Sequence, residues 1–180
     1  MGQHLARVSF ASPFGAVSIL WLDGPTGPSV MRILLPNEER LAEAVPFQAP
    51  PAAISQLSED LRRFLEGEPI TFTLDLLALE SCSPFQQSVL VAESRVPRGC
   101  VTTYGKIAAH LGAPLAARAV GGALARNPFP IIIPCHRAIR SDRHLGGFRG
   151  GLAMKRQLLA LEGVPISNDG RVLVERLHYA

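Results

Sequence analysis

Cys135, His136 and Arg137 are consecutive side chains that could together support nucleophilic chemistry. A free thiol has a reference pKa of about 8.5, so it reacts well only when a base or a positive charge favours the thiolate. Histidine and arginine directly after the cysteine could supply both. The apolar run 131–134 equally fits a strand that ends in a buried, inert cysteine. The motif alone therefore leaves both interpretations open.

The local backbone decides whether the cysteine and the histidine can act together. Neighbouring side chains of a strand point to opposite faces, so on an extended strand Cys135 and His136 would need a bend or a bridging water. A cysteine hydrolase built on this pair is one alternative. A DNA-binding module in which Cys135 is only structural is another.

The first half of the chain is typical of a small sheet with a helix. Apolar runs separated by Gly- and Pro-rich turns predict strands over 8–10, 17–22 and 30–35. Helical spacing predicts a helix over 54–65, and the run 70–76 fits a further strand. No group of residues here has the types and spacing of a catalytic site. We expect residues 1–80 to form an N-terminal α/β scaffold domain.

Residues 81–180 are predicted to be mostly helical and to form a C-terminal domain. Capping and stop signals predict helices from Ser83 to the Pro97–Gly99 turn, from Thr102 or Thr103 to Leu111, over 115–125 and over 152–161. Two short helices joined by Gly112 are a helix-turn-helix pattern. The fold class predicted for the chain is α/β (α+β), with a winged-helix-like C-terminal domain.

The two halves carry opposite charge. Residues 1–80 contain five arginines and ten acidic residues, whereas residues 81–180 contain eleven arginines, two lysines and five acidic residues. The net charges of −5 and +8 indicate a polyanionic partner for the second half. We therefore expect contacts with such a partner to lie almost entirely in the half that contains Cys135.

The predicted helix over 115–125 is almost free of bulky side chains. Gly121 and Gly122 each cost a helix about 1 kcal/mol relative to alanine, so their presence needs a reason. Tight packing on another helix is one reason. Close approach to a nucleic-acid backbone, with Arg118 projecting into the duplex, is the other.

The start of the chain and its cysteines bear on location. The segment MGQHLARVSF lacks the apolar region of a signal peptide, and no apolar run approaches the length of a membrane span. Three cysteines without a Cys-x-x-Cys pair do not fit a disulfide framework. We expect a cytoplasmic protein that needs no metal and no cofactor.

These motifs, taken in order, resemble the O6-alkylguanine–DNA alkyltransferase family, also called methylated-DNA–protein-cysteine methyltransferases. The resemblance runs from about Phe85 to Gly163. It rests on the following residues: Phe85-Gln86-Gln87, Val96-Pro97-x-Gly99, Tyr104, Ala117 to Gly121, Asn127-Pro128, Ile133 to Arg137, the glycine loop 146–151 and Leu158-Leu159-x-x-Glu162-Gly163.

The resemblance implies direct repair of O6-alkylguanine, and of O4-alkylthymine, by one irreversible transfer to the protein's own cysteine. Cys135 would be the acceptor, His136 would activate it through a water, and Glu162 would orient His136. Asn127 would hold the segment around the cysteine. Tyr104 would help to rotate the nucleotide out of the duplex and donate a proton as guanine leaves.

The resemblance also implies a DNA surface and a base pocket. Arg118 would fill the gap left by the flipped base, and a helix of small residues would lie in the minor groove. The expected DNA-binding residues are Arg118, Tyr104, Ala117, Ala119, Gly121, Gly122 and Arg126. The expected pocket residues are Pro130, Ala138, Gly146, Phe148 and Arg149. The partner is double-stranded DNA with the lesion, not a membrane, and we expect a monomer.

Two residues depart from the family pattern. Phe148 stands where many members have tyrosine, and Arg149 is bulkier than the small residue of some members, which could narrow the pocket mouth. Some relatives of the family bind lesions but have lost the cysteine. Because this chain keeps it, transfer is favoured over a recognition module without transfer, and over the cysteine hydrolase.

Overall fold

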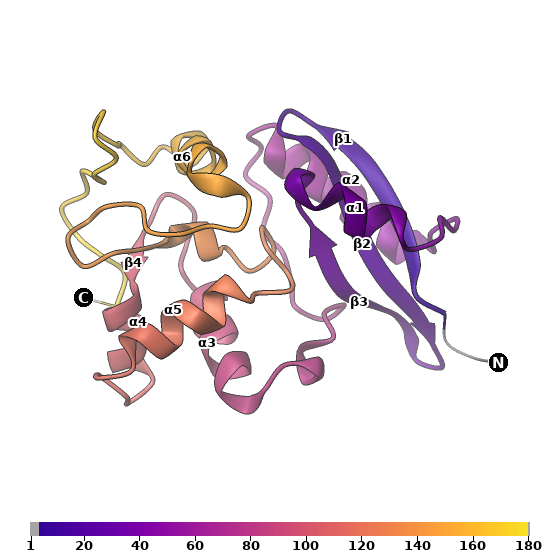
Figure 1. Ribbon diagram of the computed structural model, residues 1–180, viewed down its shortest axis with the longest axis horizontal. Coiled ribbons are helices and arrows are strands. Elements are labelled where there is room, and N and C mark those ends of the chain that lie inside the picture. The colour runs from indigo at the N-terminus through magenta and orange to yellow at the C-terminus, as the bar shows by residue number, and fades with distance from the viewer. Residues whose placement is uncertain (1–3, 180) are drawn as a thin grey trace. The chain divides into compact units, whose positions relative to one another are not determined.

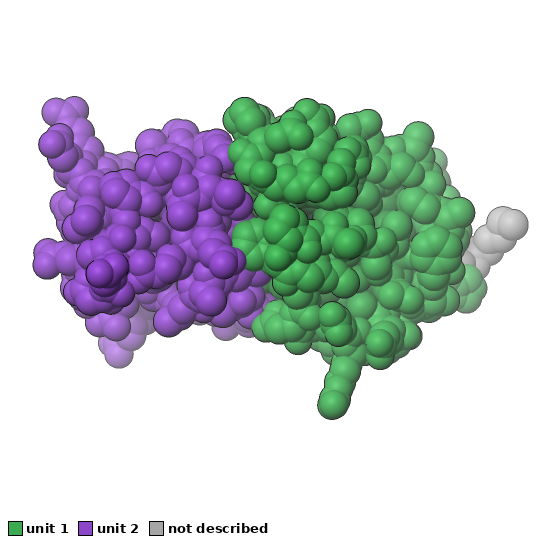
Figure 2. Space-filling view, turned by 90° about the horizontal axis from the view of Figure 1, so that it is seen from above, with its two compact units in different colours: residues 1–81, 128–132 green, residues 82–127, 133–180 purple. Residues whose placement is uncertain are grey.

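The computed structural model describes residues 4–179 and divides the chain into two compact units. Unit 1 comprises the chain up to Ser81 together with Pro128–Ile132, and unit 2 comprises Cys82–Asn127 and the chain from Ile133 onwards (Figure 2). The division into domains 1–80 and 81–180 stays a prediction. The five residues 128–132, which that division assigns to the second half, belong to unit 1.

The centre of unit 1 is an antiparallel sheet of three strands in the order β1-β2-β3 (Figure 1). The strands are β1 (Ala6–Ser12), β2 (Gly15–Gly24) and β3 (Gly27–Leu34). Gly15 and Gly27 allow the two tight hairpins because both have a positive φ, +115° and +113°. The three predicted strands are therefore confirmed.

Helix α2 (Ala52–Leu65) covers this sheet and packs on β1. Its buried residues, Ile54, Leu57, Leu61, Phe64 and Leu65, have the helical spacing that predicted it. Three short elements complete unit 1: the 3₁₀ helices Pro36–Glu38 and Leu79–Ser81 and helix α1 (Glu39–Glu43).

The strand predicted over 70–76 is wrong. None of residues 70–76 has a ladder partner, and the next residue, Leu77, makes only an isolated bridge with Val30 of β3. Its apolar side chains pack instead of pairing: the Phe72 ring lies 5.6 Å from the Phe64 ring of α2. A short apolar run can therefore be buried by side-chain packing alone, without joining a sheet.

Unit 2 is mainly helical, and its helices are α3 (Pro84–Ser94), α4 (Tyr104–His110), α5 (Ala117–Ala125) and α6 (Gly151–Leu161). A parallel pair of two-residue strands, β4 (Thr102–Thr103) and β5 (Ala138–Ile139), joins distant parts of it. Helices α4 and α5 pack together through a turn at Gly112, whose φ is +73°. The mixed α/β fold with a helix-turn-helix is confirmed.

The structure contains both predicted helix starts, and in each a hydroxyl side chain caps the first turn. Thr103 caps α4 by accepting a hydrogen bond from the backbone N–H of Lys106. Ser83 likewise accepts from the N–H of Gln86 at the start of α3. The Gln86 side chain does not complete a capping box, because it donates to the carbonyls of Ala123 and Arg126 at the end of α5.

The strand predicted to lead into Cys135 is also wrong. Residues 131–132 form a turn, and Cys135–Arg137 form a 3₁₀ helix, η3. Pro128, Pro130 and Pro134 cannot donate backbone hydrogen bonds, and Ile131 has a φ of +76°, which is rare for a β-branched residue. The cysteine therefore begins a tight turn and does not end a strand.

Candidate active site

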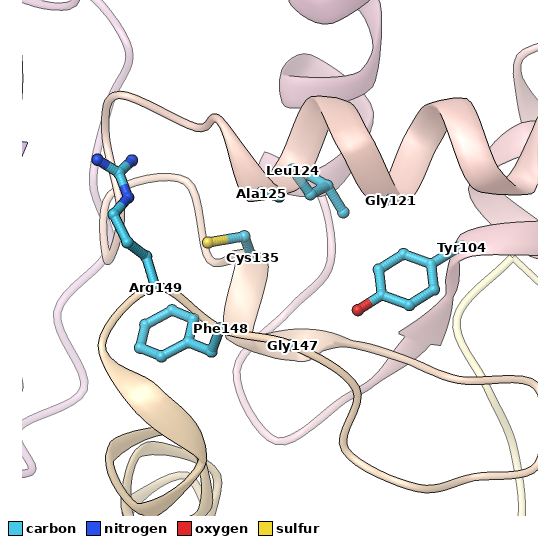
Figure 3. A pocket seen from close by; sticks show the side chains of 8 residues that line it. All are labelled: Tyr104, Gly121, Leu124, Ala125, Cys135, Gly147, Phe148 and Arg149. Atoms are coloured by element: carbon cyan, nitrogen blue, oxygen red, sulfur yellow. The ribbon is translucent and has the colours of Figure 1, made fainter.

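A pocket of about 390 Å³ in unit 2 contains the predicted nucleophile. Its lining comes from four segments: Tyr104 of α4; Gly121, Leu124 and Ala125 of α5; Cys135 of η3; and the loop residues Gly147, Phe148 and Arg149. Figure 3 shows α5 along one side of the pocket, the loop along the opposite side, and Cys135 and Tyr104 between them. The helix-turn-helix and the glycine loop thus meet at the thiol.

The Cys135 side chain is almost completely buried, with 9% of the residue exposed. Burial raises the pKa of the thiol to about 11, and a hydrogen bond with the Asn127 side chain opposes this increase only in part. In this state the thiol is therefore protonated at neutral pH, and the adjacent basic residues alone do not make Cys135 a thiolate. Asn127 also donates to the Ile133 carbonyl at 3.0 Å, so it connects the cysteine to the preceding turn.

Glu162, directly after α6, binds two side chains of η3. His136 Nε2 lies 2.9 Å from Glu162 Oε1, and Arg137 donates from Nε to Oε2 at 2.9 Å and from Nη2 to Oε1 at 2.8 Å. Burial raises the pKa of Glu162, but the hydrogen bonds from His136 and Arg137 outweigh burial and lower it to about 2. Glu162 is consequently an ionised acceptor at neutral pH.

This carboxylate fixes the tautomer of His136. An ionised carboxylate only accepts hydrogen bonds, so Nε2 carries the proton and donates it to Glu162. Burial lowers the pKa of His136, although Glu162 opposes the change, so the ring is neutral. Nδ1 is then the basic nitrogen, which is suited to accept a proton.

Tyr104 lies on the other side of the pocket, at the start of α4. Burial is the main cause that raises the pKa of its hydroxyl, to about 12, so the group remains a proton donor at any physiological pH. A Cβ atom built on Gly146 would lie 2.7 Å from Tyr104 Oη. Because glycine has no side chain, residue 146 leaves room for the hydroxyl group of Tyr104.

The other predicted pocket residues divide into three groups. Phe148 and Arg149 line the pocket, and Arg149 Nη2 donates to the backbone carbonyl of Asn127. Gly146 and Ala138 are not in the lining: Gly146 adjoins Tyr104, and Ala138 is fully buried in β5. Pro130 belongs to unit 1.

Apart from Tyr104 of α4, the predicted DNA-binding residues lie on α5 or at its end. Arg118, Ala119 and Arg126 are exposed, whereas Ala117, Gly121 and Gly122 are half-buried. A Cβ atom on Gly121 would lie 3.9 Å from the Tyr104 ring, and one on Gly122 would lie 3.5 Å from the Arg126 guanidinium. Both are ordinary contacts, so packing on a neighbouring helix does not explain the two glycines.

Several site residues are absent from the sequence-based prediction. Leu124, Ala125 and Gly147 line the pocket, and three charged residues of unit 2 are buried in addition to Glu162: Glu93, Arg137 and Lys155. Glu93 follows Val89 by four residues, and Lys155 precedes Leu159 by four. Both charges therefore fall on the apolar faces of their helices, and this spacing was the signal that could have identified them.

Two features of residues 4–179 concern metal ions and membranes. No group of three or more His, Cys, Asp or Glu side chains is arranged so that it could hold a metal ion. No helix in the same range is both long and apolar enough to cross a membrane.

Comparison with known proteins places these features in context. Residues 84–164 match the model of the 6-O-methylguanine DNA methyltransferase DNA-binding domain. The methylated-DNA–protein-cysteine methyltransferase of Methanothermobacter thermautotrophicus is 45% identical over 121 residues, which cover 67% of this chain and 68% of that protein. The protein of the same name from Mycobacterium tuberculosis is 39% identical over 151 residues, 78% and 89% of the two chains.

Solved structures agree with the sequence matches. The Mycobacterium tuberculosis OGT in complex with DNA has a TM-score of 0.72 and 34% identity, and the match covers 87% of this chain and 92% of that chain. The O6-methylguanine-DNA methyltransferase of Pyrococcus kodakaraensis has a TM-score of 0.59 and 28% identity, covering 89% and 99%. The likeness thus includes most of both units.

Proposed function

The chain belongs to the methylated-DNA–protein-cysteine methyltransferase family, and we propose that it repairs O6-alkylguanine in double-stranded DNA by moving the alkyl group to Cys135. O4-alkylthymine is the second expected substrate. The observation that carries the assignment is the position of the Cys135 thiol in a pocket beside the His136–Glu162 pair. Each molecule reacts once, because no group in the proposed site removes the alkyl group.

The proposed reaction is a displacement at the alkyl carbon. The thiol proton passes to His136 Nδ1, directly or through a water, and the sulfur forms a bond to the alkyl carbon as the carbon–O6 bond breaks. The electron pair of that bond stays on guanine, which takes up a proton. Tyr104 is the proposed donor of this proton, because its high pKa keeps the hydroxyl protonated.

Glu162 supports this reaction through His136. Its ionised carboxylate holds the Nε2–H tautomer and stabilises the imidazolium that forms when Nδ1 is protonated. Because the free thiol has a pKa of about 11, the proton transfer is unfavourable before the base is bound. We propose that the thiol loses its proton to His136 as the sulfur attacks the bound alkyl carbon, so that no free thiolate has to form beforehand.

The DNA-binding role is assigned to α5. Its small residues permit close approach to a nucleic-acid backbone, and the exposed Arg118 can enter the space left by a flipped base. The net charge of +8 in residues 81–180 favours a polyanion. The cytoplasm is the proposed location, since all three cysteines are free thiols.

Intact-mass measurement after incubation with a duplex containing one O6-methylguanine tests the proposal. The wild-type protein should gain the mass of one methyl group on the Cys135 peptide, and repair should stop after one equivalent. Cys135→Ala should bind the duplex without any mass change. Cys100→Ala is the matched control, because Cys100 is in the same unit but does not line the pocket; it should behave as wild type.

Other results would contradict the proposal in distinct ways. Tight binding of the lesion by the wild-type protein without a mass change would indicate a recognition module. Repeated release of product with a free Cys135 thiol would indicate a hydrolase.

A further inference from the structure

Arg137 is a buried side chain of η3 to which the proposed reaction assigns no role. It is 8% exposed and directly follows His136, the proposed base. Burial of a guanidinium group is costly unless the group is paired and hydrogen-bonded. The partners of Arg137 therefore decide what it contributes to the site.

Arg137 donates hydrogen bonds to two groups that are distant in the chain. Nε lies 2.9 Å from Glu162 Oε2 and Nη2 lies 2.8 Å from Oε1, which is the parallel geometry in which a guanidinium binds a carboxylate most strongly. Nη1 donates to the backbone carbonyl of Val96 at 2.5 Å, in the segment after α3. Glu162 Oε2 also accepts the backbone N–H of Gly99 at 3.4 Å. Arg137 thus holds the Glu162 carboxylate in one orientation.

His136 and Arg137 share one oxygen atom of Glu162. His136 Nε2 lies 2.9 Å from Oε1, and the same oxygen accepts Arg137 Nη2 at 2.8 Å. Two nitrogens this close to one oxygen are at most about 6 Å apart, so the Arg137 charge acts directly on the His136 ring. The side chains of His136 and Glu162 are inaccessible to solvent, so salt and water screen this interaction little.

Glu162 and Arg137 act on the protonation of His136 with opposite sign. The negative carboxylate favours the imidazolium, and the positive guanidinium disfavours it. Burial is the main cause that lowers the pKa of His136, and Glu162 opposes it. Arg137 and then Lys155 lower this pKa further. An imidazolium has no lone pair for the thiol proton of Cys135, so His136 can act as a base only while it is neutral.

The other titratable groups of this region come from three elements. They are Cys135 of η3, Lys155 of α6 and Glu93 of α3. Lys155 donates to two backbone carbonyls, and the Cys135 thiol is protonated at neutral pH. Glu93 is mostly a neutral acid, because burial raises its pKa to about 8. The buried guanidinium–carboxylate pair is thus the part of the surroundings that governs the proton of the His136 ring.

We infer that Arg137 is a positioning residue that balances the charge of Glu162 and so keeps His136 neutral and able to accept the thiol proton. The carboxylate orients the ring through Nε2, while the guanidinium prevents the same carboxylate from holding a second proton on Nδ1. Without Arg137, the full charge of Glu162 would act on His136, and the ring would become an imidazolium before the thiol reacts. The inference rests on the proposed function, because it takes His136 as the base for Cys135.

Loss of the Arg137 charge has a definite expected size. A unit charge within about 6 Å, at an effective dielectric constant of roughly 20, should change the proton affinity of His136 about tenfold to hundredfold. The acid limb of the pH profile of alkyl transfer should therefore move upward by about one to two pH units. A side chain that only supports the fold would slow the reaction by the same factor at every pH.

The first test follows the imidazole nitrogens of His136 by proton–nitrogen NMR between pH 5 and pH 9, without DNA. In the wild type the ring should be the neutral Nε2–H tautomer at pH 7. Arg137→Gln should convert it to the imidazolium within this range. Arg156→Gln is the matched control and should follow the wild type, because the Arg156 guanidinium also donates to backbone carbonyls and its loss leaves the Glu162 pair intact.

The second test measures the single-turnover rate of methyl transfer to Cys135 from a saturating duplex that contains one O6-methylguanine. The ratio of the Arg137→Gln rate to the wild-type rate should increase several-fold between pH 5.5 and pH 8.5. The same ratio for Arg156→Gln should not change with pH. A constant ratio for Arg137→Gln, or a His136 ring that stays neutral in this variant, would overturn the inference.

Three further variants keep the test decisive if Arg137→Gln folds poorly. Arg137→Met removes the charge but keeps a long side chain, so it should give the same titration of His136. Arg137→Lys keeps the charge, so it should leave the shape of the pH profile unchanged even if it lowers stability. In a Glu162→Gln background there is no carboxylate charge to balance, so Arg137→Gln should no longer change the titration. An undiminished change in that background would contradict the inference.

The NMR titration also separates this inference from the proposed function, since it needs no DNA. If the wild-type protein accepted no alkyl group, the proposed function would fail while the protonation of His136 could still be measured. If His136 stayed neutral in Arg137→Gln and the wild type repaired DNA normally, only the role of Arg137 would be lost.

Discussion

At the scale of single residues, Glu162 and Glu93 show opposite solutions for a buried carboxyl group. Glu162 receives hydrogen bonds from His136 and Arg137, and its pKa falls to about 2. Glu93 receives none, and its pKa rises to about 8. Two glutamates in one unit therefore carry different charges at neutral pH, because their hydrogen-bond partners differ.

The contact between Gly146 and Tyr104 gives a prediction at this scale. Gly146→Ala would bring a Cβ atom to 2.7 Å from Tyr104 Oη at a residue with a φ of +67°, so the tyrosine or the loop must move. We expect a loss of about 1–3 kcal/mol in the free energy of unfolding and slower transfer to Cys135. Urea denaturation and single-turnover repair assays measure the two effects.

A nearby substitution and a second-site change serve as controls. Gly147→Ala has no atom within 4 Å of the new methyl group and should cost less. In a Tyr104→Phe background the closest clashing atom is gone, so Gly146→Ala should destabilise the protein less than in the wild type. Additive effects would show that the tyrosine hydroxyl does not limit position 146.

The site residues were only partly predictable from the sequence. The family resemblance predicted that Asn127, Cys135, His136 and Glu162 act together, and the structure contains two hydrogen-bonded pairs, Asn127 with Cys135 and His136 with Glu162. The state of the thiol was not predictable, because burial depends on packing by segments distant in the chain. Glu93 and Lys155 were missed because charged helical residues are usually exposed.

At the scale of elements, periodic segments were predicted well and the proline-rich segment was not. In helix α2 and in the three strands of unit 1, apolar residues recur with the period of the element, because one face of each is buried. The run that ends at Cys135 is equally apolar but contains three prolines in residues 128–134. Hydrophobicity marked this segment as buried, whereas the missing backbone donors prevented it from becoming a strand.

Helix α5 gives the prediction at this scale. Gly122→Ala places a methyl group 3.5 Å from the flexible Arg126 side chain, so the fold should accept it and gain up to about 1 kcal/mol in the free energy of unfolding. If α5 approaches a DNA backbone, the same methyl group should weaken duplex binding several-fold. Urea denaturation measures the expected gain in stability, and a binding titration with duplex DNA measures the expected loss of affinity.

Gly105→Ala in α4 is the matched control, since its Cβ would meet only Thr103 Oγ1 at 4.0 Å. It should leave duplex affinity close to that of wild type. Unchanged affinity of Gly122→Ala would exclude close contact of DNA with this face of α5.

At the scale of the whole molecule, the buried charges predict a pH dependence of stability. A carboxyl group whose pKa rises on folding, from 4.5 to about 8 for Glu93, makes the folded state bind more protons than the unfolded state in this range. Its contribution to stability is therefore lost as the pH rises from about 4.5 to 8. Glu162 has the opposite sign, and its contribution is lost as the pH falls from about 4.5 to 2.

Comparison of Glu93→Gln with wild type isolates the first effect. The difference in the free energy of unfolding should increase in favour of the variant by about 3–5 kcal/mol between pH 4.5 and pH 8, since one pKa unit corresponds to about 1.4 kcal/mol. Urea denaturation at several pH values in this range measures it. A difference that does not change with pH would mean that Glu93 is ionised in the folded protein.

The membership of Pro128–Ile132 in unit 1 has a consequence for synthesis on the ribosome. The first 81 residues emerge early, but the N–H of Ile33 bonds to the carbonyl of Pro128, and Phe129, Ile131 and Ile132 are buried. At about 5–20 residues per second, roughly 3–10 seconds separate residue 81 from residue 132. During this interval the Ile33 N–H lacks its partner and unit 1 lacks the buried side chains of residues 128–132. The segment that completes unit 1 leaves the ribosome immediately before Cys135.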